Sequence, residues 1–162
     1  MAVTDPLAQP LRFSVELAVG AALAFGYALT WPLFTVVRRP HDPREEGTTW
    51  AAVGLLVAQA IYVGFALFAT GGDCASPEVA VEALGLALFG GLAAVGAARY
   101  SRVVVGAGWL LHGLWDVALH EFLQPGGHLA PHWYPGFCVG FDVAAAAAVW
   151  RLAVSEPAIK RV

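Results

Sequence analysis

The chain has 162 residues, of which 59% are hydrophobic and only 13% are charged, and its mean hydropathy is +0.66. A soluble globular domain of ordinary composition is far less apolar, so these values predict an integral membrane protein in contact with the lipid bilayer. The formal net charge of −3 is small and no basic tract is present, which argues against nucleic acid as a partner.

Five apolar stretches of about 20 residues follow one another, and a helix of this length crosses the hydrocarbon core of a bilayer. The expected spans are 13–37, 50–70, 78–98, 103–123 and 133–153. Pro32 should kink the first span rather than break it, because lipid forces the backbone to stay helical. We therefore expect an all-α fold, a single transmembrane domain over residues 1–162 built as a bundle of five helices.

Local signals mark the ends of the second and third spans. Thr48 or Thr49 can cap the second span, and Gly71-Gly72 should end it. Ser76 is a candidate cap of the third span, with Pro77 in the first helical position. We expect this third helix to be a packing strut whose one interior acid, Glu82, is satisfied by water or by a neighbouring helix.

The positions of the basic residues predict the orientation, because Lys and Arg concentrate in cytoplasmic connections. Eight of the nine basic residues fall after the first, third or fifth span, and Arg12 alone falls on the other side. The N-terminus is therefore expected outside and the C-terminus in the cytoplasm. The protein should be a multi-pass protein of the cell membrane.

Two spans carry a polar residue at every fourth position. These residues are His112, Asp116 and His120 on the fourth span, and Tyr134, Cys138 and Asp142 on the fifth. Residues four apart lie almost above one another on a helix, so each set makes one polar line along an apolar rod. Because acids are costly in hydrocarbon, the two lines are a candidate functional site, with a structural clasp between helices as the alternative.

The two lines also match each other in an antiparallel hairpin, where residues at equal depth keep a constant index sum. This register pairs His112 with Asp142, Asp116 with Cys138, and His120 with Tyr134. We expect side-chain contact or a one-water bridge between His112 and Asp142, close to the middle of the membrane.

Aromatic side chains flank this site. Trp109 and Trp115 lie on either side of the His112 face of the helix and can wall a pocket for a lipophilic ligand. Tyr62, Gln59 and Tyr134 are candidate hydrogen-bonding partners. The predicted substrate-binding residues are Trp109, Trp115, Tyr62 and Tyr134.

The polar lines are also a candidate metal site for zinc, copper or iron. Its ligands would come from His112, Asp116, His120, Cys138 and Asp142. Three residues of one line spread over about 12 Å and cannot all reach one ion through bonds of about 2 Å. Asp116 and His120 with Cys138, or His112 and Asp116 with Asp142, meet this limit.

The chain has two cysteines, and both lie toward the outer side of the predicted topology. A disulfide between Cys74 and Cys138 is conceivable in an oxidising compartment. We expect instead that Cys138 is a small buried residue or a soft metal ligand.

The string GWLLHGLWDVALH, followed by C-x-x-x-D in the fifth span, resembles an uncharacterised family of small bacterial five-span integral membrane proteins with a GWLLH-x-x-WD-x-x-HH pattern. The resemblance covers most of the chain, including the RRPHD connection and the region of Tyr62. Glu121 stands where that pattern has a second histidine, which argues against a metal site that needs both adjacent histidines. The resemblance implies the fold and the motif but no activity.

Three classes of function fit these residues. We favour a membrane-embedded enzyme whose catalytic His112, Asp116, His120 and Asp142 act as acid and base on a small lipophilic substrate, in a pocket open to the outer side. Histidine exchanges protons near neutral pH, which suits an isomerisation or cyclisation. A metal-binding membrane protein is the second class, and a structural or proton-conducting subunit is the third. The substrate and the oligomeric state do not follow from the sequence.

Overall fold

The computed structural model describes residues 14–24, 43–119, 129–131 and 133–154. These residues form five helices: Ser14–Ala24, α2 (Pro43–Ala69), α3 (Pro77–Ala98), α4 (Arg102–Val117) and α5 (Tyr134–Val154). The all-α class is therefore confirmed. Among the described residues, two helical segments, Gly47–Ala69 and Pro77–Ala98, are long and apolar enough to cross a membrane.

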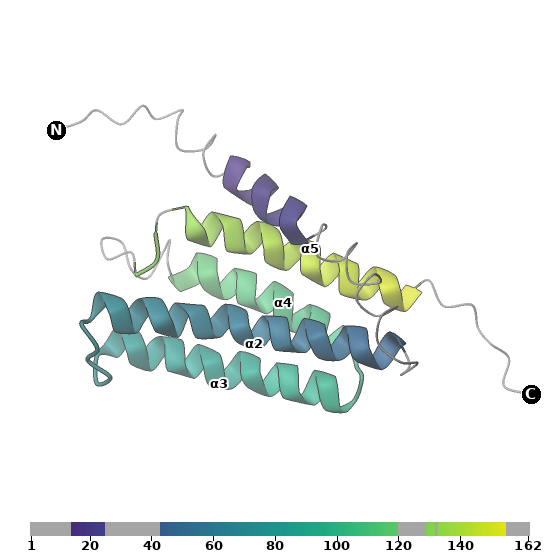
Figure 1. Ribbon diagram of the computed structural model, residues 1–162, viewed down its shortest axis with the longest axis horizontal. Helices are drawn as coiled ribbons and strands as arrows, with labels where there is room; N and C mark the ends of the chain where they lie inside the picture. Colours follow the sequence, from purple (N-terminus) through teal and green to yellow (C-terminus); the bar gives the residue numbers. More distant parts are fainter. Residues whose placement is uncertain (1–13, 25–42, 120–128, 132, 155–162) are drawn as a thin grey trace, which may run out of the picture.

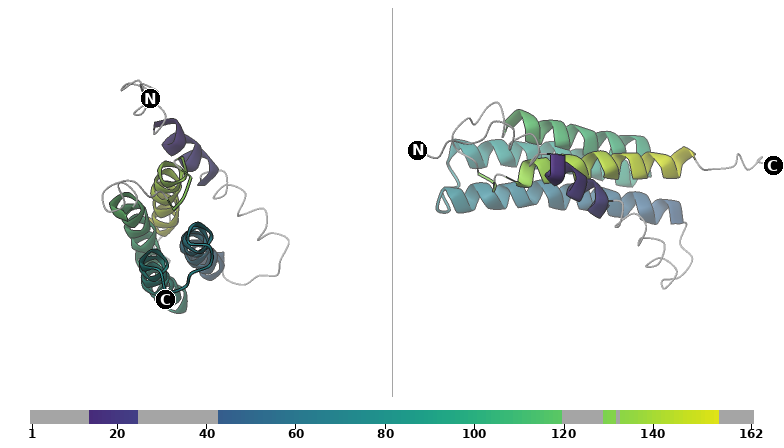
Figure 2. Two further views of the ribbon diagram at one scale, coloured as in Figure 1. Left: turned by 90° about the vertical axis from the view of Figure 1, so that its left-hand side faces the viewer. Right: turned by 90° about the horizontal axis from the view of Figure 1, so that it is seen from above.

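The helices form two packed pairs. α2 packs against α3, α4 packs against α5, and α3 joins the pairs through its contacts with α4. Figure 1 shows the four helices side by side, and the end-on view of Figure 2 shows that their long axes run in nearly the same direction. α2 and α5 touch each other at few points. The cavity described below lies where these two helices make few contacts.

The helix Ser14–Ala24 packs on the face of α5 that points away from the other helices (Figure 1). Two glycines allow the two backbones to come close. A Cβ atom on Gly20 would collide with the carbonyl of Phe137, and one on Gly140 would collide with the carbonyl of Leu17. Small residues at such crossings permit close helix packing. The remainder of the predicted first span, including Pro32, lies outside the described residues.

The start of α3 and the end of α2 follow the local signals. The Ser76 side chain accepts a hydrogen bond from the Val79 backbone N–H at 3.2 Å, and Pro77 occupies the first turn, as predicted. Gly71 and Gly72 have φ angles of 64° and 88° after the last residue of α2. These positive angles suit glycine, which ends the helix at no steric cost.

The predicted cap of the second helix is wrong. α2 begins at Pro43, so Thr48 and Thr49 lie inside the helix and do not mark its start. Proline is favoured in a first helical turn. The apolar stretch, by contrast, begins several residues later. The helix therefore extends beyond the part that hydropathy alone indicates.

Three other predicted stretches coincide with helices where the structure describes them. α3 and α5 match the predicted limits to within one residue at each end. α4 starts one residue earlier than expected and its regular α-helix ends at Val117. Residues 120–123 of the predicted fourth span lie outside the described part of the chain.

Candidate functional site

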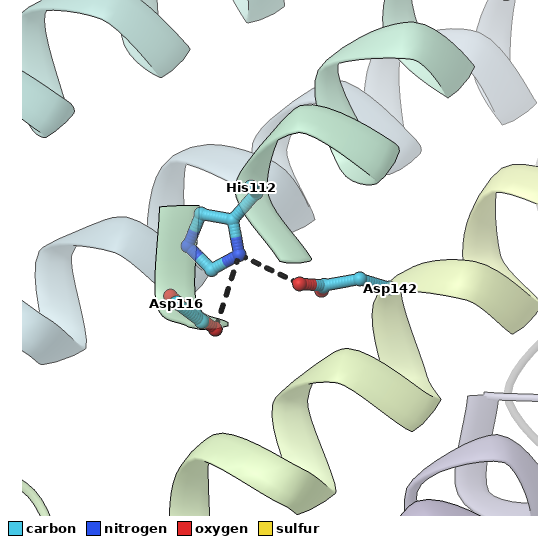
Figure 3. Close-up of side chains that lie close together, drawn as sticks. All are labelled: His112, Asp116 and Asp142. Atoms are coloured by element: carbon cyan, nitrogen blue, oxygen red, sulfur yellow. Dashed lines mark hydrogen bonds and ion pairs between the residues drawn. The ribbon is translucent and has the colours of Figure 1, made fainter. Parts of the chain in front are cut away.

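The centre of the site is a buried pair that joins α4 to α5. Nδ1 of His112 lies 2.8 Å from Oδ2 of Asp142, and the two residues are 0% and 1% exposed (Figure 3). Gly113 allows this approach, since a Cβ atom there would lie 3.3 Å from the same carboxylate oxygen. The predicted contact, and with it the hairpin register, is confirmed.

Asp116 adds a second carboxylate from the next turn of α4. Its Oδ2 lies 3.7 Å from the same Nδ1 atom of His112, so one ring nitrogen faces both acids (Figure 3). Asp116 is 0% exposed, and neither of its oxygens has a hydrogen-bond partner of standard geometry among the described residues. Nε2 of His112 likewise has no such partner. The centre therefore holds buried donor and acceptor atoms that make no hydrogen bond of standard geometry within the described part of the chain.

One donor atom from each of His112, Asp116 and Asp142 lies within 4.8 Å of the other two. This spacing places the three atoms near enough to share one ion or one proton. This group of three residues is the second of the two ligand combinations predicted from the sequence. Cys138 is not a member of the group, and His120 lies outside the described residues.

Tyr62 of α2 lies beside the second predicted pair of the hairpin, Asp116 and Cys138. Asp116 and Cys138 are close enough to interact electrostatically, as the register requires. The Tyr62 hydroxyl interacts with both side chains. Its ring lies 6.0 Å from the His112 ring and 5.4 Å from the Tyr134 ring, measured between centroids. A third helix thus contributes to the site, as the sequence suggested for Tyr62.

A second buried polar pair lies beside the centre, between α2 and α3. Nε2 of Gln59 donates to Oε2 of Glu82 at 2.9 Å, and both residues are 0% exposed. Gly85 makes room for the amide, since a Cβ atom there would lie 2.7 Å from Nε2. Glu82 also interacts with Trp115 and His112. Of the two partners expected for Glu82, water or a neighbouring helix, the structure supplies the neighbouring helix. The sequence did not identify Gln59 as the partner, although an acid at i with glycine at i+3 in an apolar helix is a usable signal for such a pair.

An apolar cavity of about 390 Å³ lies between α2 and α5. Trp109, Tyr134, Cys138 and Asp142 border it, and Asp142 is the one charged residue among the described residues that line it. The lining runs along α2 from Gly47 to Ile61. Several of the α2 residues that line it are exposed at the side of α2 in the described part of the chain. The predicted opening toward the outer side stays a prediction.

The four predicted substrate-binding residues separate into two groups. Trp109 and Tyr134 line the cavity, and the Trp109 indole N–H donates to the carbonyl of Ala51 at 3.1 Å. Trp115 and Tyr62 do not line it. Trp115 packs edge-on against Phe89 with the ring centroids 5.9 Å apart, so its contacts are those of the helix core.

The cysteines are both free, with Cys74 exposed and Cys138 buried. Cys138 is therefore the small buried residue that we expected. Its thiol also borders the cavity next to Tyr134. The alternative of a Cys74/Cys138 bridge is not realised in this structure.

Comparisons of the chain with protein-family models, with curated proteins and with solved structures find no significant match. The resemblance to the family with the GWLLH-x-x-WD pattern therefore stays a prediction. Any function must be argued from the geometry of the site.

Proposed function

We propose that this protein is a five-span membrane enzyme that transfers protons on a small lipophilic substrate. Its N-terminus lies outside and its C-terminus in the cytoplasm. The observation that carries the proposal is the buried His112/Asp142 pair, held at 2.8 Å, whose Asp142 lines the apolar cavity. A substrate in this cavity would meet one charged group, the carboxylate of Asp142.

The distribution of polar and apolar side chains supports the membrane part of the proposal. Large apolar residues are exposed on every described helix, as Phe68 at 88% and Val103 at 68% illustrate. The carboxylates of Glu82, Asp116 and Asp142 are buried instead. Water would favour the reverse arrangement, whereas lipid favours apolar surfaces and acids that face the interior of the bundle.

The geometry suits proton transfer. Asp142 can accept a proton from a bound molecule and return it, while Nδ1–H of His112 donates to Oδ2 of Asp142 and fixes the orientation of the carboxylate. Oδ2 of Asp116, 3.7 Å from the same ring nitrogen, favours the tautomer of His112 that carries its proton on Nδ1. Positioned acids and bases of this kind typically contribute about 10²–10⁴ in rate. A substrate that loses a proton at one carbon and regains it at another is isomerised without any other reactant.

Deuterium incorporation tests the proposal for any substrate that exchanges a carbon-bound proton with water. Purified protein in lipid nanodiscs is incubated in D₂O buffer with the lipophilic extract of the cells that produce it, and the extract is analysed by mass spectrometry. At least one compound should gain deuterium or change its retention time with the native protein. Asp142→Asn should lower the rate by about 100-fold or more.

Two matched variants test the role of the cavity. Ala145 lines the cavity, whereas Ala147 is exposed on another face of α5. Ala145→Trp should abolish the exchange by filling the cavity, and Ala147→Trp should leave it unchanged. Exchange that is equal in the native protein, in Asp142→Asn and without protein would refute the enzyme proposal.

Metal binding is a second candidate function, and the three donor atoms of His112, Asp116 and Asp142, all within 4.8 Å of one another, favour it. Neutral His112 with the two aspartates carries two negative charges, which one divalent zinc, copper or iron ion would balance. Nitrogen and oxygen donors suit such ions. Elemental analysis of untagged protein should then give about one metal per chain, lost in Asp116→Asn but kept in Glu82→Gln. Absence of metal from native protein would refute this candidate.

A further inference from the structure

We propose that the cavity between α2 and α5 binds a lipophilic cation, an apolar molecule whose positively charged end lies against Asp142. The proposal rests on the proposed function, because it names the substrate class of the same site. It follows from three properties of the described residues: the charge at the inner wall, the aromatic lining and the size of the cavity.

The first property is a shortage of positive charge. His112 can balance one carboxylate, yet two carboxylates face its Nδ1 atom, and Glu82 interacts with the same ring. The described basic residues of α4 and α5 are remote from this centre. Arg102 precedes His112 by ten positions and Arg151 follows Asp142 by nine, about 15 Å and 14 Å along the helices. A ligand cation would supply the missing charge where the dielectric constant is low.

The second property is the aromatic lining. Five aromatic residues border the cavity: Trp50, Trp109, Tyr134, Phe137 and Phe141. Aromatic rings attract organic cations through the negative potential of their faces, and aromatic cages bind quaternary ammonium groups in this way. A carboxylate among aromatic rings therefore favours a cation over a neutral group of the same shape. It disfavours an anion.

The third property is size. The cavity volume of about 390 Å³ falls at the small end of the range for sites that bind small molecules, about 300–1,000 Å³. The part of the lining formed by Val53, Val57 and Ile61 is aliphatic and exposed at the side of α2. It suits a short hydrocarbon chain that enters from the lipid. The charged end would then reach Asp142 at the inner wall.

A pair of isosteric probes tests the inference. One is a decyl chain that carries a trimethylammonium group and a diazirine, and the other replaces the ammonium nitrogen by carbon and is otherwise identical. Both are titrated against protein in uncharged maltoside detergent with EDTA, so that no metal ion balances the carboxylates. Photo-crosslinking to peptides of α2 and α5 is then quantified by mass spectrometry.

The cationic probe should half-saturate the cavity at a concentration about tenfold lower than the neutral probe. Asp142→Asn should reduce this preference to less than about threefold, while Asp142→Glu, which keeps the charge, should retain most of it. Ala145→Trp should abolish crosslinking by both probes and Ala147→Trp should not. Thermal unfolding of each variant verifies that it is folded.

Two results would overturn the inference in distinguishable ways. If both probes bind equally well to native protein, the cavity binds lipophiles without preference for charge, and the inference fails while the proposed substrate cavity stands. If neither probe crosslinks to the cavity in native protein, the cavity is not a ligand site, and the substrate pocket of the proposed function fails with it.

Discussion

Replacement of His112 by leucine should destabilise the protein more than replacement of Asp142, although both residues belong to the same hydrogen bond. Asp142→Leu removes the 2.8 Å contact, but the ring keeps its 3.7 Å contact with Asp116. The expected cost is that of one charge-assisted hydrogen bond, about 1.5–3 kcal/mol. His112→Leu removes both contacts and takes from two buried carboxylates the imidazole that they share, for which about 3–5 kcal/mol is expected.

A triple variant with leucine at positions 112, 116 and 142 should regain most of this loss. This variant leaves none of the three ionisable side chains of the centre buried without its partner. Apolar residues of similar volume often replace buried ion pairs at little cost. The free energy of unfolding is measured by titration with SDS in mixed micelles containing EDTA, followed by tryptophan fluorescence. Ala147→Leu, at an exposed position of α5, is the control and should change stability by less than about 0.5 kcal/mol.

The reasoning fails if His112→Leu costs no more than Asp142→Leu, because the imidazole would then not hold both acids. It also fails if the triple variant is as unstable as His112→Leu. In that case the loss would reflect the packing volume of the ring rather than the stranded carboxylates. The three variants therefore separate electrostatics from packing at this centre.

Two further predictions concern the second polar pair and the topology. Gly85→Ala should cost about 1–3 kcal/mol, because its Cβ atom would displace Gln59 from Glu82, whereas Gly91→Ala meets nothing within 4 Å and should stabilise the helix slightly in the same SDS titration. The exposed Cys74 should react with an impermeant maleimide in intact cells, and a cysteine at the exposed Tyr100 in a Cys74→Ser background should react only after lysis. The opposite labelling pattern would invert the proposed orientation.

The two polar pairs suggest how the bundle holds its helices in register. If the bundle lies in a membrane, as proposed, its association gains little from apolar contact, so interhelical hydrogen bonds and close packing contribute most of the specificity. Gln59 and Glu82 join α2 to α3, while His112 and Asp142 join α4 to α5. Each pair thus fixes how the two helices of one hairpin are aligned along their axes. Tyr62, which interacts with Asp116, links the two hairpins.

The sequence by itself determined what depends on local geometry. The four-residue spacing on α4 and α5 fixes which side chains share a helix face, and the short distance between the two spans along the chain makes them neighbours in an antiparallel hairpin. These two facts suffice to place His112 beside Asp142. Capping at Ser76 and the glycines after α2 are likewise local, since they satisfy backbone groups within a few residues.

The tertiary structure alone decided what depends on the angles and distances between helices that are remote in the sequence. Glu82 and Gly85 mark one face of α3, but the pattern of α3 does not identify Gln59 as the partner, because Gln59 lies on another helix whose rotation is set by packing. The cavity has the same origin: α2 and α5 both pack on α4 but hardly on each other, and their seam leaves Asp142 beside an apolar space. Helical periodicity fixes the faces of each helix, whereas the closeness of two faces from separate hairpins is fixed only when all the helices pack together.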